Sequence, residues 1–187
     1  MQVPSASGDE ETNFLRDICG GQEKVVRLRL YIHDLRVGSA NPTVYTVATA
    51  SITANSPTGF GRVNVVDDKI TTGPSFNSPE IARTQGLTTS ADLAVSAVAL
   101  NTNIFFTAGR FNGSTISIVG RNQIMNPQRE LVVVGGTGAF RFARGYAIQS
   151  TYSFDTAASY AVMEFNIYTT YNSKFAHVEN NIDIAQM

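Results

Sequence analysis

Hydrophobic and polar residues alternate along most of the chain between Val25 and Tyr171. The alternation is clearest at Val26, Leu28, Leu30 and Ile32, which are separated by single, mostly polar residues. A period of two is typical of a β-strand with one buried and one exposed face. Other segments are rich in the Val, Thr, Ile and aromatic residues that favour strands. They are NPTVYTVATASITA, FGRVNVVDD, LAVSAVALNTNIFFTA, RFNGSTISIVG, RELVVVGGTGAF, RFARGYAIQSTYSF and SYAVMEFNIYTTY.

Turn residues separate these segments, and no amphipathic helix is predicted between them. Asn112-Gly113 is the strongest short-range signal for a hairpin. Eight or nine strands joined by turns predict an antiparallel sheet, and closing that sheet removes its exposed edges. We therefore predict an all-β fold, an eight-stranded antiparallel β-barrel whose interior holds one small ligand. A two-sheet sandwich is the alternative, and residues 91–101 have a composition that also suits a helix.

The 187 residues are enough for one domain with a sizeable core and short for two. We predict a flexible N-terminal arm over residues 1–23, a barrel domain over 24–172 and a C-terminal tail over 173–187. The first residues are polar and acidic, and they lack the basic start and apolar stretch of a secretory signal. Either the protein is not exported and works in the cytoplasm, or the chain has been trimmed.

Charge and composition argue against several classes of function. Charged residues make up 16% of the chain, against about 25% in an average domain, which favours a surface partly buried against other subunits. The net charge is −1 and no basic run occurs, so a nucleic-acid partner is not expected. No apolar stretch approaches the roughly 20 residues that span a membrane. One cysteine, Cys19, and two distant histidines, His33 and His177, make a metal site improbable.

Asp34 breaks the pattern, because it has the parity of the apolar residues Leu30 and Ile32. If the strand continues, Asp34 points inward, and burying a carboxylate without a partner is costly. Desolvation would then suit it to exchange a proton near neutrality. If the strand ends at His33, Asp34 caps a turn before Gly38.

Two arginines are further candidates. Arg144 shares a predicted strand face with Phe142, Tyr146 and Ile148, so it either orients an anionic or phenolic guest or forms a structural ion pair. Arg129 begins the strand RELVVVGG, and it becomes functional only if it faces Asp34 across the barrel opening.

Other polar motifs predict structure rather than chemistry. Asp67 and Asp68 are adjacent on a strand and point to opposite faces, which makes them a poor catalytic pair with each other. The run Gly135–Gly138 lacks the Lys-Ser/Thr of a phosphate loop and predicts a tight turn.

The stretch from His33 to Tyr171 resembles the plant dirigent family. The resemblance rests on several long motifs in order. They are HD at 33–34, FGRVNVVDD, ITTGP, IARTQG, FNGSTISIVGRN, RELVVVGGTGAFRFARGYA and the closing EFNIY.

This resemblance implies a calycin-type barrel, like that of allene oxide cyclase, usually a homotrimer that is secreted to the plant cell wall (the apoplast) and needs no cofactor. Many members steer the coupling of two phenoxy radicals, made by a separate oxidase, into one stereoisomer of a lignan. Pterocarpan synthases of the same family dehydrate an isoflavanol and close a ring through a quinone methide.

Pocket residues of the family are carried over one position at a time. The aspartate of the HD motif corresponds to Asp34, and the arginine of the RE motif corresponds to Arg129, expected beside it. Lignan-forming members have a second aspartate where this chain has Asn122, and tyrosines where it has Leu87 to Ser90. These departures fit a member that acts on another phenolic skeleton. The predicted catalytic residues are Asp34 and Arg129, and the predicted substrate contacts are Asn122, Thr88, Ser90, Arg144 and Tyr146.

Three hypotheses follow. The protein is a dirigent protein that directs a reaction started by an oxidase, or a pterocarpan-synthase-like dehydratase, or a carrier of small molecules without chemistry.

Overall fold

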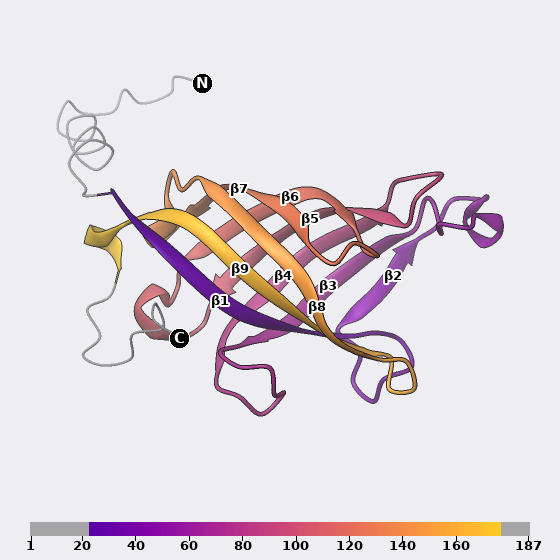
Figure 1. The fold of residues 1–187 in the computed structure, drawn as a ribbon, viewed down its shortest axis with the longest axis horizontal. Coiled ribbons are helices and arrows are strands. Elements are labelled where there is room, and N and C mark those ends of the chain that lie inside the picture. Colours follow the sequence, from indigo (N-terminus) through magenta and orange to yellow (C-terminus); the bar gives the residue numbers. More distant parts are fainter. Residues whose placement is uncertain (1–22, 177–187) are drawn as a thin grey trace, which may run out of the picture.

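The structure is a computed structural model that describes residues 23–176. Nine strands and four short 3₁₀ helices follow one another along this part of the chain (Figure 1). The strands are β1 (Glu23–Leu35), β2 (Val44–Ala48), β3 (Val63–Thr71), β4 (Glu80–Ser90), β5 (Ala97–Phe106), β6 (Thr115–Gln123), β7 (Arg129–Thr137), β8 (Gly145–Asp155) and β9 (Tyr160–Asn172). The 3₁₀ helices are η1 (Thr53–Asn55), η2 (Gly109–Phe111), η3 (Gly138–Phe140) and η4 (Ser173–Phe175).

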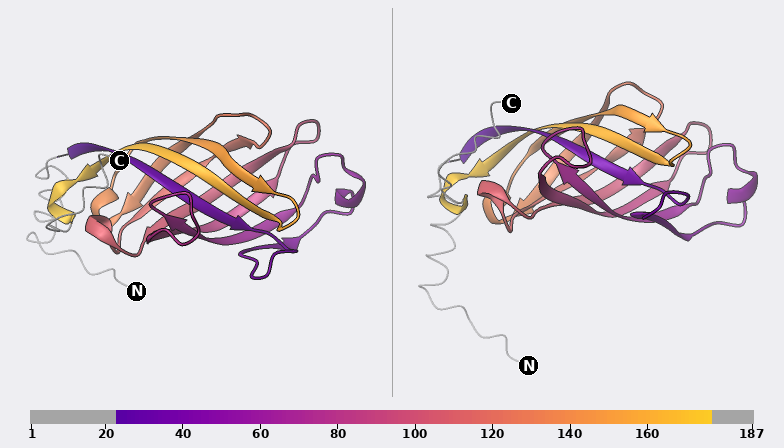
Figure 2. Two further views of the ribbon diagram at one scale, coloured as in Figure 1. Left: turned by 60° about the horizontal axis from the view of Figure 1, so that its bottom comes forward. Right: turned by 90° about the horizontal axis from the view of Figure 1, so that it is seen from below.

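All neighbouring strands pair antiparallel, and the sheet closes on itself. Strand β1 pairs with β9 along its whole length, and residues 31–33 of β1 also pair with residues 69–71 of β3. Strand β2 pairs with the rest of the same edge of β3, so β1 and β2 together occupy one strand position of the barrel. The barrel therefore has eight strand positions around its interior. Figure 2 shows the elongated barrel from two further sides. The predicted eight-stranded barrel is confirmed, and the sandwich alternative is wrong.

Three segments differ from the sequence-based expectation. Residues 91–96 form a loop and β5 begins at Ala97, so the alternative of a helix over residues 91–101 is wrong. The run NPTVYTVATASITA pairs only over β2, because Thr53 then folds the chain into a turn by bonding to Ala50 N–H and to the Phe60 carbonyl. The predicted tight turn at the glycine run is partly strand: β7 continues to Thr137, and η3 makes the turn.

Gly136 shows why glycine is needed in that run. A Cβ atom there would lie 2.1 Å from the Thr115 carbonyl oxygen on the paired strand β6. Only glycine lets the two backbones approach so closely.

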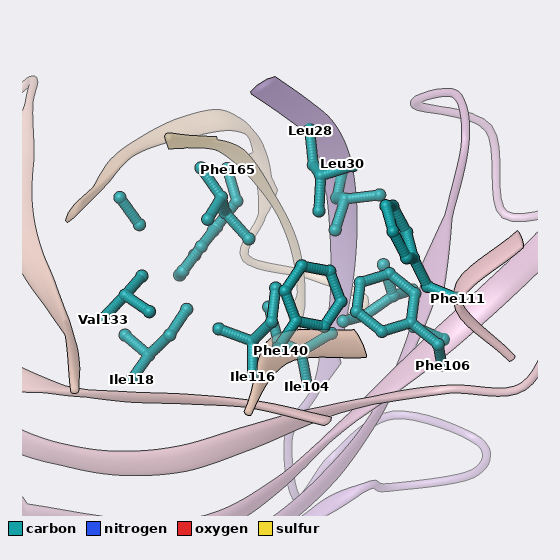
Figure 3. Packing of buried hydrophobic residues seen from close by; sticks show 14 of the residues in the cluster. Leu28, Leu30, Ile104, Phe106, Phe111, Ile116, Ile118, Val133, Phe140 and Phe165 are labelled. Carbon is teal, nitrogen blue, oxygen red and sulfur yellow. The ribbon is translucent and has the colours of Figure 1, made fainter. Parts of the chain in front are cut away.

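Buried apolar side chains pack together inside the barrel, and Figure 3 shows part of this core from close by. Phe106, Phe111 and Phe140 meet there, with ring centroids 4.7–5.7 Å apart. Inward-facing aliphatic residues of the strands surround them, among them Leu28, Leu30, Ile104, Ile116 and Ile118. The short helices η2 and η3 contribute Phe111 and Phe140, so they close this end of the barrel from within.

The predicted flanks lie mostly outside the described residues and stay predictions. Of the predicted tail, Ser173–Phe175 forms η4, and Phe175 packs against the core. Between residues 23 and 176, no helix is both long enough and apolar enough to cross a membrane.

Candidate functional site

A cavity of about 370 Å³ occupies the half of the barrel that the aromatic core leaves open. Strand β5 shows how one strand passes from the core into the wall of the cavity. Ile104 and Phe106 of β5 are core residues, whereas Leu100 and Thr102 of the same strand line the cavity. Aliphatic side chains form part of its wall, and its polar groups come from strands β1 to β6, from β8 and from the loops between them. Such a space suits a flat, mainly apolar guest with a few hydroxyl groups.

Asp34 lines this cavity. Strand β1 continues to Leu35, so Asp34 keeps the inward parity of Ile32, and the alternative of a turn cap is wrong. Its carboxylate accepts hydrogen bonds of 2.9–3.2 Å from the guanidinium of Arg36, which balances the negative charge. Arg36 is half exposed and also lines the cavity, so the ion pair lies where the cavity meets solvent.

Asp68 is a second cavity carboxyl, and it is nearly fully buried. Its parity follows Val66 and Ile70 of β3, so it points inward while Asp67 points outward to Arg83. Burial, and after it the negative charge of Asp34, raises the pKa of Asp68 to about 7, although a hydrogen bond from the Thr43 hydroxyl acts to lower it. At pH 7 the Asp68 carboxyl is therefore protonated in about half of the molecules, so the cavity offers a proton donor beside the ion-paired Asp34 carboxylate.

This raised pKa predicts how stability changes with pH. The folded protein holds the Asp68 proton up to about pH 7, whereas the unfolded chain releases it near pH 3.8. The folded state binds more protons in between, so this group lowers the free energy of unfolding as pH rises from about 4 to 7. We expect Asp68→Asn to remove that loss. In urea unfolding, the free energy of unfolding of the variant should therefore rise relative to that of the native protein between pH 5 and pH 8. An equal pH dependence of the two proteins would contradict the assignment.

Asn122, Thr88 and Ser90 all line the cavity, as the sequence predicted. The Asn122 amide donates to Gln149 Oε1 at 2.6 Å, and its own Oδ1 is buried without a partner among residues 23–176. Thr88 accepts a hydrogen bond from Asn64. A buried acceptor without a partner is costly, so Asn122 Oδ1 is a place for a hydroxyl group of a guest to donate.

Arg129 does not lie against Asp34, which differs from the expectation. It is buried, and its guanidinium donates to the carbonyls of Ile124 and Asn126 and to the Thr151 hydroxyl at 3.0–3.2 Å. Within the described part of the chain no carboxylate pairs with it, and burial lowers its pKa. Backbone carbonyls of the turn between β6 and β7 are closer partners for this guanidinium, so here it holds that turn against β8.

Arg144 and Tyr146 are not among the residues that line the cavity, and their predicted contact with a guest stays a prediction. Strand β8 begins at Gly145, and its inward residues are Ala147 and Gln149, which gives Tyr146 the outward parity. Arg144 is exposed and forms a 2.6 Å ion pair with Glu23, the structural alternative that its sequence context left open. Tyr146 stacks on Tyr168 on the outer surface.

We expect Arg144→Gln to leave ligand binding and product stereochemistry unchanged. An ion pair that is open to solvent contributes little to stability, so the free energy of unfolding should stay close to that of the native protein. Chiral chromatography of the product and a urea titration check both expectations, and a change in product handedness would show that the outer surface takes part.

Sequence reasoning missed two residues of the site, Arg36 and Asp68. Each carried a signal. Arg36 is two positions after Asp34 and therefore on the same side of an extended chain, and Asp68 shares the parity of Val66 and Ile70.

The family model of dirigent-like proteins matches residues 25–170, which is the whole barrel. The chain belongs to the dirigent family. Dirigent protein 21 of Arabidopsis thaliana is 44% identical over 146 residues, which cover 78% of this chain and 77% of that protein. Pterocarpan synthase 1 of Glycyrrhiza echinata is 40% identical over 148 residues, covering 79% of this chain and 78% of the relative.

Solved structures of this dirigent family agree with the fold. The pterocarpan synthase dirigent protein GePTS1 superposes with a TM-score of 0.78 at 35% identity, covering 92% of this chain and all of that one. PsPTS1, another pterocarpan synthase dirigent protein, gives a TM-score of 0.70 at 36% identity over 84% of this chain. No group of three or more His, Cys, Asp or Glu side chains among residues 23–176 is placed to hold a metal ion.

Proposed function

We propose that this dirigent protein imposes stereoselectivity on the coupling or cyclisation of a phenolic phenylpropanoid or isoflavonoid intermediate in plant secondary metabolism. The intermediate is a phenoxy radical or a quinone methide, and both are planar and electrophilic and give racemic products in free solution. A cavity with mixed apolar and polar walls that admits one guest limits competing water and presents one face of the intermediate to its partner. A difference of about 1.4 kcal/mol between competing transition states is enough for a tenfold bias.

The observation that carries this proposal is the pair of unlike carboxyl groups in the cavity. Asp34 forms an ion pair with Arg36, whereas burial raises the pKa of Asp68 to about 7. A phenol bound between them donates its hydroxyl proton to Asp34, while Asn122 Oδ1 accepts from a second hydroxyl group. Arg129 is separated from this pair, and its predicted role is to fix the wall that carries Met163.

The second candidate is a dehydrating cyclase like the pterocarpan synthases, and the neutral Asp68 specifically favours it. Asp68 gives its proton to the alcohol oxygen of an isoflavanol, the C–O bond breaks and water leaves. Asp34 takes the proton of the conjugated phenol, and a quinone methide forms. A second phenolic oxygen then adds to the methide carbon and returns its proton to Asp68, while Asp34 returns the first proton to the methide oxygen. The sum is substrate to product plus water, with no oxidant or cofactor.

A product assay separates these candidates. Isoflavanols and monolignols are each incubated with the protein, with and without a one-electron oxidase, and the products are resolved by chiral chromatography. Conversion of an isoflavanol without oxidase supports the cyclase. Formation of a single enantiomer that requires the oxidase supports directed coupling. Binding without conversion or selectivity under either condition would leave only the carrier hypothesis and would contradict the proposal.

We also propose a homotrimer. The outer face of the barrel carries an exposed apolar row formed by Tyr45, Val65 and Leu87, which are register partners across β2, β3 and β4. Exposed apolar rows of this kind are typical of protein interfaces. Sedimentation should give the mass of three chains at micromolar concentration, and a monomer would contradict this proposal.

The place of action is proposed from family resemblance, as secretion to the plant cell wall. Fractionation of plant tissue that makes the tagged full-length protein tests it. The protein should appear in the apoplastic fluid, and retention in the cytoplasm would contradict secretion.

A further inference from the structure

We propose that a second pocket, on the outer face of the barrel, binds small aromatic carboxylates. This outer pocket has a volume of about 330 Å³ and lies over the junction of β1 and β3, separate from the central cavity. Its lining residues are Leu35, Ala40, Asn41, Thr43, Lys69, Phe76, Arg83 and Tyr160. The proposal does not depend on the reaction assigned to the central cavity.

The walls of the outer pocket are apolar and aromatic. Phe76, from the loop between β3 and β4, and Tyr160, at the start of β9, have ring centroids 6.4 Å apart at an interplanar angle of 82°. Leu35 and Ala40 come from the end of β1 and the segment after it. A volume of this size with flat walls suits a ligand of one aromatic ring and a short side chain.

Two cations face each other across the strands at this pocket. Lys69 of β3 and Arg83 of β4 are direct register partners, and like charges in that position repel. Arg83 is already neutralised by Asp67 at 2.6 Å and by Glu80 at 3.5 Å. Lys69 donates to the Phe76 carbonyl at 2.9 Å and lies 4.6 Å from the Phe76 ring centroid, and no carboxylate within residues 23–176 pairs with it. The negative charge of an anionic ligand would therefore complement the positive charge of Lys69 in this wall.

The histidine beneath the pocket adds no charge at neutral pH. His33 is fully buried, between the Thr71 hydroxyl at 2.7 Å and the Tyr160 hydroxyl at 2.5 Å. The Thr71 hydroxyl donates to the Gly73 carbonyl, so His33 Nε2–H donates to Thr71, and Nδ1 accepts from Tyr160. Burial and the nearby charge of Lys69 lower the pKa of His33 to about 4. The positive charge available to a ligand is thus that of Lys69.

Binding of trans-cinnamate to the full-length protein, followed by ¹⁵N chemical-shift changes at pH 7, tests the proposal. We expect a Kd of about 1 mM, with the largest shifts around Lys69 and Phe76, and at least about tenfold weaker binding of the neutral cinnamamide. Lys69→Met keeps the aliphatic stem and removes the charge, and it should weaken cinnamate binding at least about tenfold. Ala40→Trp fills the pocket from an exposed position and should abolish the shifts.

Arg36→Met is the matched control, because it removes a cation of the central cavity instead. It should leave cinnamate binding within about twofold of that of the native protein. Loss of binding in Arg36→Met with retention in Lys69→Met would place the anion in the central cavity and overturn the proposal. Absence of saturable binding by the native protein up to 10-fold above the expected Kd, about 10 mM, would overturn it as well.

Discussion

Replacing Asp34 by asparagine is expected to lower the rate of product formation by about 100- to 10,000-fold, the contribution typical of one positioned acid or base. Asparagine keeps the size and one carbonyl acceptor of the carboxylate, but it cannot take a proton from a phenol. The substitution also leaves Arg36 without its anionic partner. The rate is measured with the substrate found in the oxidase panel, together with the enantiomeric excess of the product.

Asp67→Asn is the control for this experiment. Asp67 is on the outward face of β3, next in sequence to the cavity residue Asp68, and it pairs with Arg83 on the surface. We expect its rate and product handedness to match those of the native protein. If Asp34→Asn retains both rate and handedness, Asp34 takes no part in the reaction and its assignment as proton acceptor is wrong.

The second large effect concerns stability. Phe140→Ala should lower the free energy of unfolding by about 3–5 kcal/mol, because it removes a fully buried ring and leaves a void that its neighbours cannot fill. The Phe140 ring centroid lies 4.7 Å from that of Phe111 and 5.5 Å from that of Phe106, so both lose a partner. A thermal melt should show a midpoint lower by roughly 6–20 °C.

Phe142→Ala gives the matched comparison, because Phe142 is exposed and only two residues away. We expect its free energy of unfolding to stay within about 0.5 kcal/mol of the native value. Equal losses in the two variants would show that the aromatic cluster is not the core of this half of the barrel.

Much of the barrel was predictable because strand alternation is a local property. The pattern from Val26 to Ile32 identified β1 and gave Asp34 its inward parity, and both are observed. The same rule placed Asp67 and Asp68 on opposite faces, and it implied that Asp68 points inward. It did not indicate that Asp68 would lie near Asp34. Strand β8 shows the limit of the rule, because its inward residues are Ala147 and Gln149, which puts the aromatic Tyr146 on the outer face.

Contacts between distant segments were not predictable from the pattern. Arg129 has inward parity, yet its guanidinium bonds to carbonyls of the preceding turn, whose geometry no period of two encodes. The coupling of Asp34 to Asp68 depends on how β1 meets β3 where the barrel closes, a pairing between segments far apart in sequence.

The account depends most on a neutral Asp68 beside the Asp34 carboxylate in a cavity that admits a phenolic guest. Carbon NMR of the Asp68 carboxyl group, titrated from pH 3 to pH 9 with and without that guest, measures this directly. We expect a midpoint near 7 in the free protein that falls in Asp34→Asn and moves when the guest binds. A midpoint near 4 that neither the substitution nor the guest changes would contradict the account.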